Sequence, residues 1–221
     1  MATIVPKGED KKRKEKQNKI SSTIAQYKSF YMGLMGRWNK DKMQKQCIAT
    51  AQKFTTISKD GKTYKLTNYT PKEKDINMFC IVQNVRILKQ CTTIDFSGLP
   101  IGNWGAFQVA SLIAGVITSD KPVYTIETIN LSGCGIDDVG GWTIIDMLNR
   151  LTPESKLRNI ILDGNQIDAD TAMTMMVKIN DPTKNAIYKK MNISLLKNPI
   201  PDESRKIINS NANIKAYKLK F

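Results

Sequence analysis

A recurring alternation of apolar and polar residues marks the second half of the chain. Three segments, CTTIDFSGLPI (91–101), IETINLSGCGI (126–136) and LRNIILDGNQI (157–167), fit the template apolar-x-x-apolar-x-apolar-x-x-(Asn or Cys)-x-apolar, except that the first has Leu99 at the Asn or Cys position. Apolar side chains two residues apart share one face of a strand, and an inward Asn or Cys can satisfy backbone groups where the chain bends. The pattern therefore predicts a short strand and a turn in each segment.

The same template extends toward the C-terminus through KMNISLLKNPI (190–200) and IKAYKLKF (214–221). The five predicted strands are indexed by Ile94, Ile129, Ile160, Ile193 and Tyr217, which are 35, 31, 33 and 24 residues apart. Leucine-rich repeats usually have a period of about 20 to 29 residues. Most of these intervals are longer, so their units must hold a helix as well as a strand. Helical periodicity supports this in the intervening segments, Trp104–Thr118, Asp138–Leu151, Asp170–Ile179 and Asp202–Ala212.

The predicted fold is α/β: a short leucine-rich repeat solenoid of about four or five strand–helix units, with a parallel sheet on its concave face. This repeat domain is expected to span residues 91–221. Cys134, Asn165 and Asn198 occupy the Asn or Cys position of the template, and we expect them to have structural roles.

The turns between the predicted strands and helices resemble those of a known class of repeats. IDDVGGWTIIDMLNRL (136–151) and IDADTAMTMMVKI (167–179) resemble the ribonuclease-inhibitor-like class of leucine-rich repeats, in which an Ile-x-Asp turn opens a full helix. The resemblance covers roughly residues 91–221 and identifies no individual protein. It implies that Asp137 or Asp138, and Asp168 or Asp170, cap their helices by accepting hydrogen bonds from free amides.

Two further units are predicted upstream of the repeats. Residues 63–90 combine a short apolar run with a helix. Thr70 is the predicted N-cap, Pro71 takes the first helical position and Glu73 closes a capping box. This unit is a cap for the array or an imperfect repeat. Residues 20–62 form a helical extension, because one face of a helix is described by Ile20, Ile24, Tyr27, Tyr31, Leu34 and Trp38.

Residues 1–19 lack an apolar stripe and are crowded with positive charge. We expect this tail to be disordered, or ordered by a partner, and its basic residues to act as an anchor. The anchoring residues of this arm are Lys11, Lys12, Arg13, Lys14, Lys16 and Lys19. A solvated, lysine-rich surface without a partner is the alternative.

Charge is concentrated at the two ends of the chain. Residues 1–75 hold 18 Lys and Arg against 7 Asp and Glu, and residues 184–221 hold 9 against 2, whereas residues 76–183 hold 7 against 11. Two electropositive ends favour an acidic polymer or an acidic surface as the partner.

The composition narrows the class of protein. With 221 residues, of which 41% are hydrophobic, the chain can bury one elongated core. It has neither a long apolar stretch nor a signal-peptide core, so we expect a cytoplasmic protein that contacts no membrane. None of the four cysteines forms a C-x-x-C pair, which favours reduced structural thiols over zinc ligands or disulfides.

Catalysis has little support. The chain contains no histidine, which removes the usual general base and the commonest metal ligand. The adjacent Asp137 and Asp138 are explained as helix-start acids, and no phosphate-binding glycine loop is present. We therefore expect no catalytic residues, no cofactor and no metal. GTPase-activating proteins for the small nuclear GTPase Ran share the repeat class, but they have longer arrays and no such basic arm.

The template also indicates a binding surface. The residues between paired apolar positions should face the concave side: Asp95, Asn130, Ile161, Ser194 and Lys218. A second column comprises Ser97, Ser132, Asp163, Lys197 and Lys220. A mixed polar surface suits a protein partner better than phosphates, which would require a continuous basic stripe. The alternative is that these residues simply face water.

Two functional hypotheses follow. The first is a non-catalytic scaffold docked in a larger assembly through the arm and the repeats. Small proteins of this class with basic extensions are similar to cytoskeletal components, including those of cilia and flagella, where the acidic surface of a tubulin-based microtubule would bind the arm.

The second hypothesis is a ribosome- or nucleic-acid-associated protein. The KKRK run (11–14) would neutralise phosphates, helped by Tyr27, Tyr31 and Trp38. The same run could be a nuclear import signal, so the nucleus is the alternative location. Sensitivity of binding to nuclease separates the two hypotheses.

Overall fold

The computed structural model describes residues 7–38, 40–115, 121–179, 183, 188, 191–210 and 218–220. In this part of the chain, seven strands form one sheet whose spatial order follows the sequence. The strands are β1 (Thr55–Ile57), β2 (Thr63–Leu66), β3 (Thr93–Asp95), β4 (Thr128–Asn130), β5 (Asn159–Ile161), β6 (Asn192–Ser194) and β7 (Lys218–Lys220). β1 is antiparallel to β2, and every later pair is parallel.

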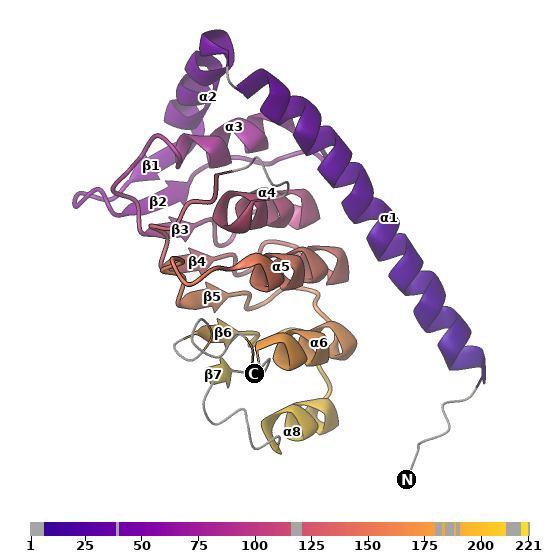
Figure 1. Cartoon of the computed structure of the whole chain (residues 1–221). Coiled ribbons are helices and arrows are strands. Elements are labelled where there is room, and N and C mark those ends of the chain that lie inside the picture. Colours follow the sequence, from indigo (N-terminus) through magenta and orange to yellow (C-terminus); the bar gives the residue numbers. More distant parts are fainter. Residues whose placement is uncertain are drawn as a thin grey trace.

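The helices lie on one side of this sheet (Figure 1). They are α1 (Lys7–Trp38), α2 (Asp41–Phe54), α3 (Ile76–Asn84), α4 (Gly102–Ala114), α5 (Asp138–Arg150), α6 (Ala169–Ile179) and α8 (Asp202–Ser210). Helices α3, α4, α5, α6 and α8 stack in one layer, and α1 crosses the outside of that layer. The opposite side of the sheet, called here the open face, corresponds to the predicted concave surface. The predicted fold class, a short leucine-rich repeat solenoid preceded by a helical basic arm, is confirmed.

The repeat template positions form the core. Ile94, Ile129, Ile160 and Ile193 pair in register across four adjacent strands, and each is buried. The side chain of Asn165 satisfies backbone groups of two successive repeats. Its Oδ1 accepts hydrogen bonds from the amides of Cys134 and Ile136, both at 3.0 Å, and its Nδ2 donates to the carbonyls of Leu131 and Leu162.

The next repeat reuses this arrangement. Asn198 Oδ1 accepts from the Ile167 amide at 3.0 Å, and its Nδ2 donates to the carbonyls of Leu162 and Leu195. In the preceding repeat the thiol of Cys134 lies 3.2 Å from the carbonyl of Phe96. All three template residues are therefore buried where the chain leaves a strand, and they provide the hydrogen bonds that the turning backbone lacks.

The helix predicted with Thr70 as its N-cap starts five residues later than expected. Asp75 is the N-cap of α3, and its side chain accepts a hydrogen bond from the Asn77 amide. Lys74 has a φ of 53°, which a continuous helix cannot include. The predicted capping box of Thr70 and Glu73 was therefore wrong. The helix is capped by Asp75, which follows it in the sequence.

Residues 63–90 have the element order of a repeat. β2 pairs in parallel with β3, with Tyr64 beside Ile94, and α3 follows it. β1 and α2 lie beyond this unit at the end of the array, where α2 buries Met43, Cys47 and Ala51. The expected boundary between residues 62 and 63 falls inside the β1–β2 hairpin.

The arm differs from the sequence prediction in its extent. The helix expected to begin at residue 20 begins at Lys7, so the boundary expected after residue 19 falls inside α1. Its C-terminal half is held by buried aromatic residues: the Tyr27 ring centroid lies 5.3 Å from that of Trp104, and the Tyr31 centroid lies 5.8 Å from that of Phe107. Residues 1–6 of the expected tail lie outside the described residues.

The register of the last strand also differs. Leu219 pairs with Ile193, and Lys220 pairs with Ser194. The prediction had placed Tyr217 and Lys218 in these positions, two residues earlier; Tyr217 itself lies outside the described residues. A shift of two residues keeps every side chain on its own face, so the alternation could not distinguish the two registers.

Candidate functional site

The open face is built from two rows of residues that flank the buried centre of each strand. One row runs through Lys65, Asp95, Asn130, Ile161 and Ser194, which are cross-strand neighbours in sequence order. The structure thus brings together four of the predicted concave-face residues. Lys65 joins them at one end, and at the other end Lys220 takes the register position that had been assigned to Lys218.

The second row is a hydrogen-bonded ladder. Asn192 Nδ2 donates to Asn159 Oδ1 at 3.0 Å, and Asn159 Nδ2 donates to Thr128 Oγ1 at 3.1 Å. Each of these side chains is partly exposed. The prediction missed this row, although the same alternation places it on the open face, two residues before the row that it found. Because the amides bond to one another, they present donors and acceptors in fixed orientations.

An apolar centre interrupts the polar rows. Ile161 is partly exposed in the middle of the face, and Leu196, in the next repeat, is 38% exposed. The amide of Leu196 donates to Asp163 Oδ1 at 2.9 Å, which fixes the turn beside Ile161. Exposed aliphatic side chains surrounded by polar neighbours form the centre of many protein interfaces.

The second predicted column is correct in three repeats and wrong in the last two, where Lys197 is displaced by Leu196 and Lys220 pairs with Ser194 of the first row. The amides of Gly98, Gly133 and Gly164 each donate to the next repeat, the last of them to the carbonyl of Leu196. Leu196 therefore aligns with Asp163, and Lys197 occupies the glycine position, with a φ of 60°. Strict alternation points to Leu196, and the predicted Lys197 was one place off it. The positive φ of Lys197 is uncommon for lysine.

Charge on the open face is partly neutralised. Lys65 Nζ lies 3.4 Å from Asp95 Oδ2, and Asp95 Oδ1 accepts a hydrogen bond from the Ser97 hydroxyl at 2.7 Å. Asp95, the acidic residue of the first row, is therefore in an ion pair.

The basic arm forms ion pairs with the first turns of the repeat helices. Lys16 Nζ lies 2.6 Å from Asp138 Oδ2 and also contacts Asp168, while Arg13 Nε lies 3.8 Å from Asp170. Two of the six residues predicted to anchor a partner are thus in contact with the protein's own repeats. The other four, Lys11, Lys12, Lys14 and Lys19, are exposed, and none forms an ion pair in the part of the chain that the structure describes.

The two carboxylates that bind Lys16 lie at the starts of α5 and α6. Asp138 follows Asp137, the N-cap of α5, and Asp168 Oδ1 accepts a hydrogen bond from the Thr171 amide at 3.0 Å at the start of α6. Asp138 Oδ1 accepts from the Asp168 amide at 3.0 Å and from the Thr171 hydroxyl at 2.7 Å. One lysine therefore contacts a network that joins two repeats.

This network shifts the acidities of its members. Burial opposes the charge of Lys16, but hydrogen bonds with Asp138 and Asp168 raise its pKa above the ordinary value. Burial would likewise raise the pKa of Asp168, but hydrogen bonds from Lys16 and from the Thr171 amide lower it overall. Both shifts favour the charged pair at neutral pH.

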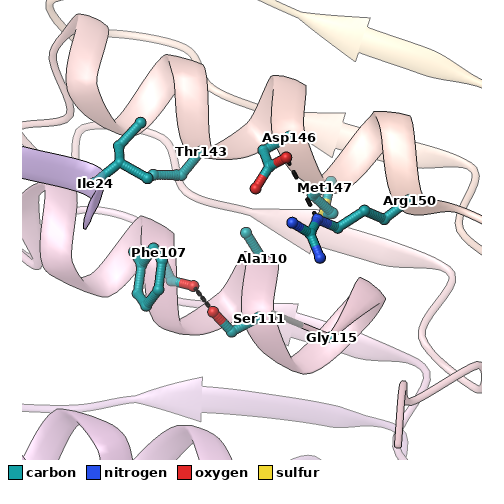
Figure 2. A pocket seen from close by; sticks show the side chains of 9 residues that line it. All are labelled: Ile24, Phe107, Ala110, Ser111, Gly115, Thr143, Asp146, Met147 and Arg150. Carbon is teal, nitrogen blue, oxygen red and sulfur yellow. Dashed lines mark hydrogen bonds and ion pairs between the residues drawn. The ribbon is translucent and has the colours of Figure 1, made fainter. Parts of the chain in front are cut away.

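A hollow between α4 and α5, beside α1, is shown in Figure 2. Ile24 of α1 and Phe107 of α4 line it, and Asp146 and Arg150 of α5 form an ion pair at its edge, with 3.3 Å between Oδ1 and Nε. Its volume of about 10 Å³ has room for no more than about one water molecule. Among the described residues, there is no group of His, Cys, Asp and Glu side chains that could hold a metal ion, and no helix is long and apolar enough to cross a membrane.

Comparisons with known proteins give a likeness in structure but none in sequence. No family model matches the chain, and no curated protein matches it in sequence. Among solved structures, the chain is similar to "Leiomodin-1 Actin-Binding Site 2 (ABS2)", with 12% identity and a TM-score of 0.48. The likeness covers 69% of this chain and 82% of that chain.

Proposed function

We propose that the chain is a non-catalytic protein-interaction scaffold, which docks in a larger assembly through the open face of its sheet. The observation that supports this most strongly is the apolar surface that the partly exposed Ile161 and the exposed Leu196 present among ordered polar groups. Interfaces between proteins combine such an apolar centre with a polar rim that excludes water. The ladder of Thr128, Asn159 and Asn192 supplies one side of that rim.

The four exposed lysines of α1 provide a second contact. Their charge, within a chain of net charge +14, favours an acidic protein surface and increases the rate of association with it. We further propose that the assembly is cytoskeletal, and that a microtubule, including one in a cilium or flagellum, is the first acidic surface to test.

The repeat class is also part of the proposal. Asp137 and Asp168 each cap a full helix one residue after a template isoleucine, Ile136 or Ile167. A full helix that opens at an aspartate just after a template isoleucine resembles the ribonuclease-inhibitor-like repeats, although the cap directly follows the isoleucine and is not the Asp of an Ile-x-Asp turn. We propose on this ground that the chain belongs to that class.

Nucleic acid is a less suitable partner than protein. Tyr27, Tyr31 and Trp38 are 3%, 0% and 8% exposed, so these rings pack in the core and cannot stack on bases. Arg13 and Lys16 are in ion pairs within the chain. The four remaining lysines do not continue as a basic stripe onto the open face, where Lys65 is paired with Asp95.

Affinity purification from the source cell, with and without nuclease, tests this function. The variants are Ile161→Arg on the open face and a quadruple Lys→Glu replacement at Lys11, Lys12, Lys14 and Lys19. A matched control changes the same amount of charge elsewhere, with Lys→Glu at the exposed residues Lys40, Lys42, Lys45 and Lys59.

We expect protein partners that resist nuclease, that are lost with Ile161→Arg, and that are reduced by the arm variant but not by the control. Release of the partners by nuclease would show that the scaffold proposal is wrong and would support the ribonucleoprotein alternative. Retention of the same partners by the open-face variant would exclude the open face as their binding surface.

A further inference from the structure

Two of the four cysteines are in contact with each other, where α2 packs on α3. Cys47 of α2 and Cys80 of α3 are both fully buried, and both are free thiols. The thiol of Cys47 donates a hydrogen bond to the sulfur atom of Cys80. By contrast, the thiols of Cys91 and Cys134 donate to backbone carbonyls. Contact between two sulfur atoms is the first geometric requirement of a disulfide, and the pair of Cys47 and Cys80 meets it.

Helix α2 is held on the protein by one narrow stripe. Its buried residues are Met43, Cys47 and Ala51, each four positions apart, while Ile48 on another side is 36% exposed. Its N-cap residue, Lys40, provides no side-chain hydrogen bond to the free amides of the first turn. A helix at the end of an array (Figure 1), with few buried side chains and no side-chain cap, opens at a lower free energy than the central repeats. Because Cys47 occupies the middle of the stripe, such an opening exposes both thiols at once.

The hydrogen bond gives the two thiols different acidities. Cys80 accepts it, and this lowers the pKa of Cys80 below its ordinary value, although burial opposes the change. Cys47 donates it, and this hydrogen bond raises the pKa of Cys47, with burial acting in the same direction. Since the thiolate is the nucleophile, Cys80 is the thiol that reacts first and Cys47 is the one that follows.

We propose that Cys47 and Cys80 form a reversible redox switch, in which hydrogen peroxide converts the pair to a disulfide that locks α2 onto α3. The thiolate of Cys80 attacks one oxygen of the peroxide, the O–O bond breaks, and Cys80 becomes a sulfenic acid while the other oxygen leaves as water. Cys47 then attacks the sulfur of Cys80, the S–O bond breaks, and a second water leaves. In total the two thiols lose two electrons and two protons, and the peroxide takes up both. A dithiol reductant reverses the reaction by thiol–disulfide exchange.

The disulfide changes how this end of the array behaves. In the reduced protein, α2 opens and closes, and each opening exposes the side of α3 on which Cys80 lies. In the oxidised protein, the bond between Cys47 and Cys80 keeps the cap closed, which protects that apolar surface while peroxide is present. The switch goes beyond the proposed function, because it involves no residue of the open face and no residue of the basic arm.

The test is peroxide treatment of the folded, full-length protein, followed by alkylation of the remaining thiols and mass spectrometry of the peptides. Hydrogen exchange of the α2 amides is measured on the same samples. Cys47→Ser removes the pair. Cys91→Ser is the matched control, because it replaces a buried thiol that donates to the carbonyl of Thr93 rather than to another thiol. Circular dichroism confirms that both variants fold.

We expect one disulfide in the oxidised wild type, between Cys47 and Cys80 of the same molecule. Exchange of the amides around Cys47 should become about tenfold slower, and the midpoint of urea unfolding should rise. Dithiothreitol should reverse both changes, which separates the disulfide from oxidation of methionine, because reduction of methionine sulfoxide requires dedicated enzymes. Cys91→Ser should respond like the wild type, and Cys47→Ser should not respond.

Peroxide treatment that leaves both thiols free in the folded protein would overturn the proposal. So would a disulfide that forms only in urea, or one that joins either thiol to Cys91, to Cys134 or to a second molecule. A native disulfide that leaves the exchange of α2 unchanged would overturn the locking role. The wild-type results decide these points even if a variant fails to fold. Because Cys47→Ser should retain the protein partners that bind the open face, a failure of this proposal is distinguishable from a failure of the proposed function.

Discussion

The ammonium group of Lys16 lies 2.6 Å from the carboxylate of Asp138, and this ion pair joins the basic arm to the start of α5. The same ammonium contacts Asp168, the N-cap of α6, so one arm residue binds two successive repeats. The aromatic half of α1 is held by core packing, whereas the contacts described for residues 7–19 are mainly ionic. The two halves of α1 should therefore differ in how easily they leave the repeats.

Loss of the Lys16 ammonium should loosen the first half of α1 without unfolding the protein. In Lys16→Met we expect amide hydrogen exchange across residues 7–19 to become several-fold faster, with no change across residues 27–38. The free energy of unfolding should fall by no more than about 1 kcal/mol, because partly exposed ion pairs contribute little. Lys12→Met, at an exposed position, is the control and should exchange like the wild type; equal acceleration in both variants would contradict the role of Lys16.

The same contact should depend on pH at both extremes. The pKa of Asp168 is lowered, so its contribution is present above about pH 4, its ordinary pKa, and is lost as the pH falls through the lowered value. The pKa of Lys16 is raised, so its contribution is present below about pH 10 and is lost as the pH rises through the raised value. The protection factors of the amides of residues 7–19, which correct for the pH dependence of intrinsic exchange, should accordingly be highest between these limits.

Asp168→Asn is a control for the loosening of residues 7–19 at low pH. Asn is also a good N-cap, so α6 should remain folded while its negative charge is removed. The acid-dependent loosening should become smaller in this variant. If the loosening at low pH is unchanged in this variant, other carboxylates cause it.

Asn165 should be far more important for stability than Asn159, although both are asparagines of the same repeat. Asn165→Ala leaves the buried amides of Cys134 and Ile136 without their acceptor, and we expect a loss of about 3 kcal/mol in the free energy of unfolding. Asn159→Ala should cost less than about 1 kcal/mol, because water can replace the bonds of a partly exposed amide. Urea denaturation measures both values, and similar losses would contradict the structural role of Asn165.

Tyr31 should hold α1 on the repeats. Its side chain is fully buried against Phe79 and Phe107, so Tyr31→Ala should destabilise the protein by about 3 to 5 kcal/mol. Tyr31→Phe keeps the ring and removes the hydroxyl, which lies 3.4 Å from Gln83 Nε2, and it should cost about 1 kcal/mol. Thermal or urea unfolding distinguishes them, and a small effect of Tyr31→Ala would show that α1 is held by its other contacts.

The repeat strands were predictable because their inward residues recur in a fixed local pattern. Ile94, Ile129, Ile160 and Ile193 are spaced so that any strand through them must bury the same face, and the structure places them side by side. The open-face row through Asn130 and Ile161 follows from the same alternation. Local pattern was sufficient wherever the strand alternation and the turn after it agreed.

The errors arose where long-range contacts or equivalent alternatives decide the structure. Lys16 of the arm pairs with Asp138 and Asp168, which are far from it in sequence, so a local view of the arm's charge, which predicted disorder, could not include these contacts. The register of β7 could shift by two residues without exposing its apolar face. Lys197 adopts the positive φ of a repeat glycine, which no residue preference for lysine would suggest.

The most direct test of the central claim places a photo-activatable amino acid at Ile161 of the full-length protein, in nuclease-treated extract of the source cell. A second protein with the same group at Lys45, on the exposed side of α2, is the control. The scaffold account predicts a discrete protein adduct at position 161 that is absent at position 45 and is suppressed by an excess of unlabelled wild type but not of Leu196→Arg. No adduct at position 161, or the same adducts at both positions, would contradict the claim that the open face is a protein-binding surface.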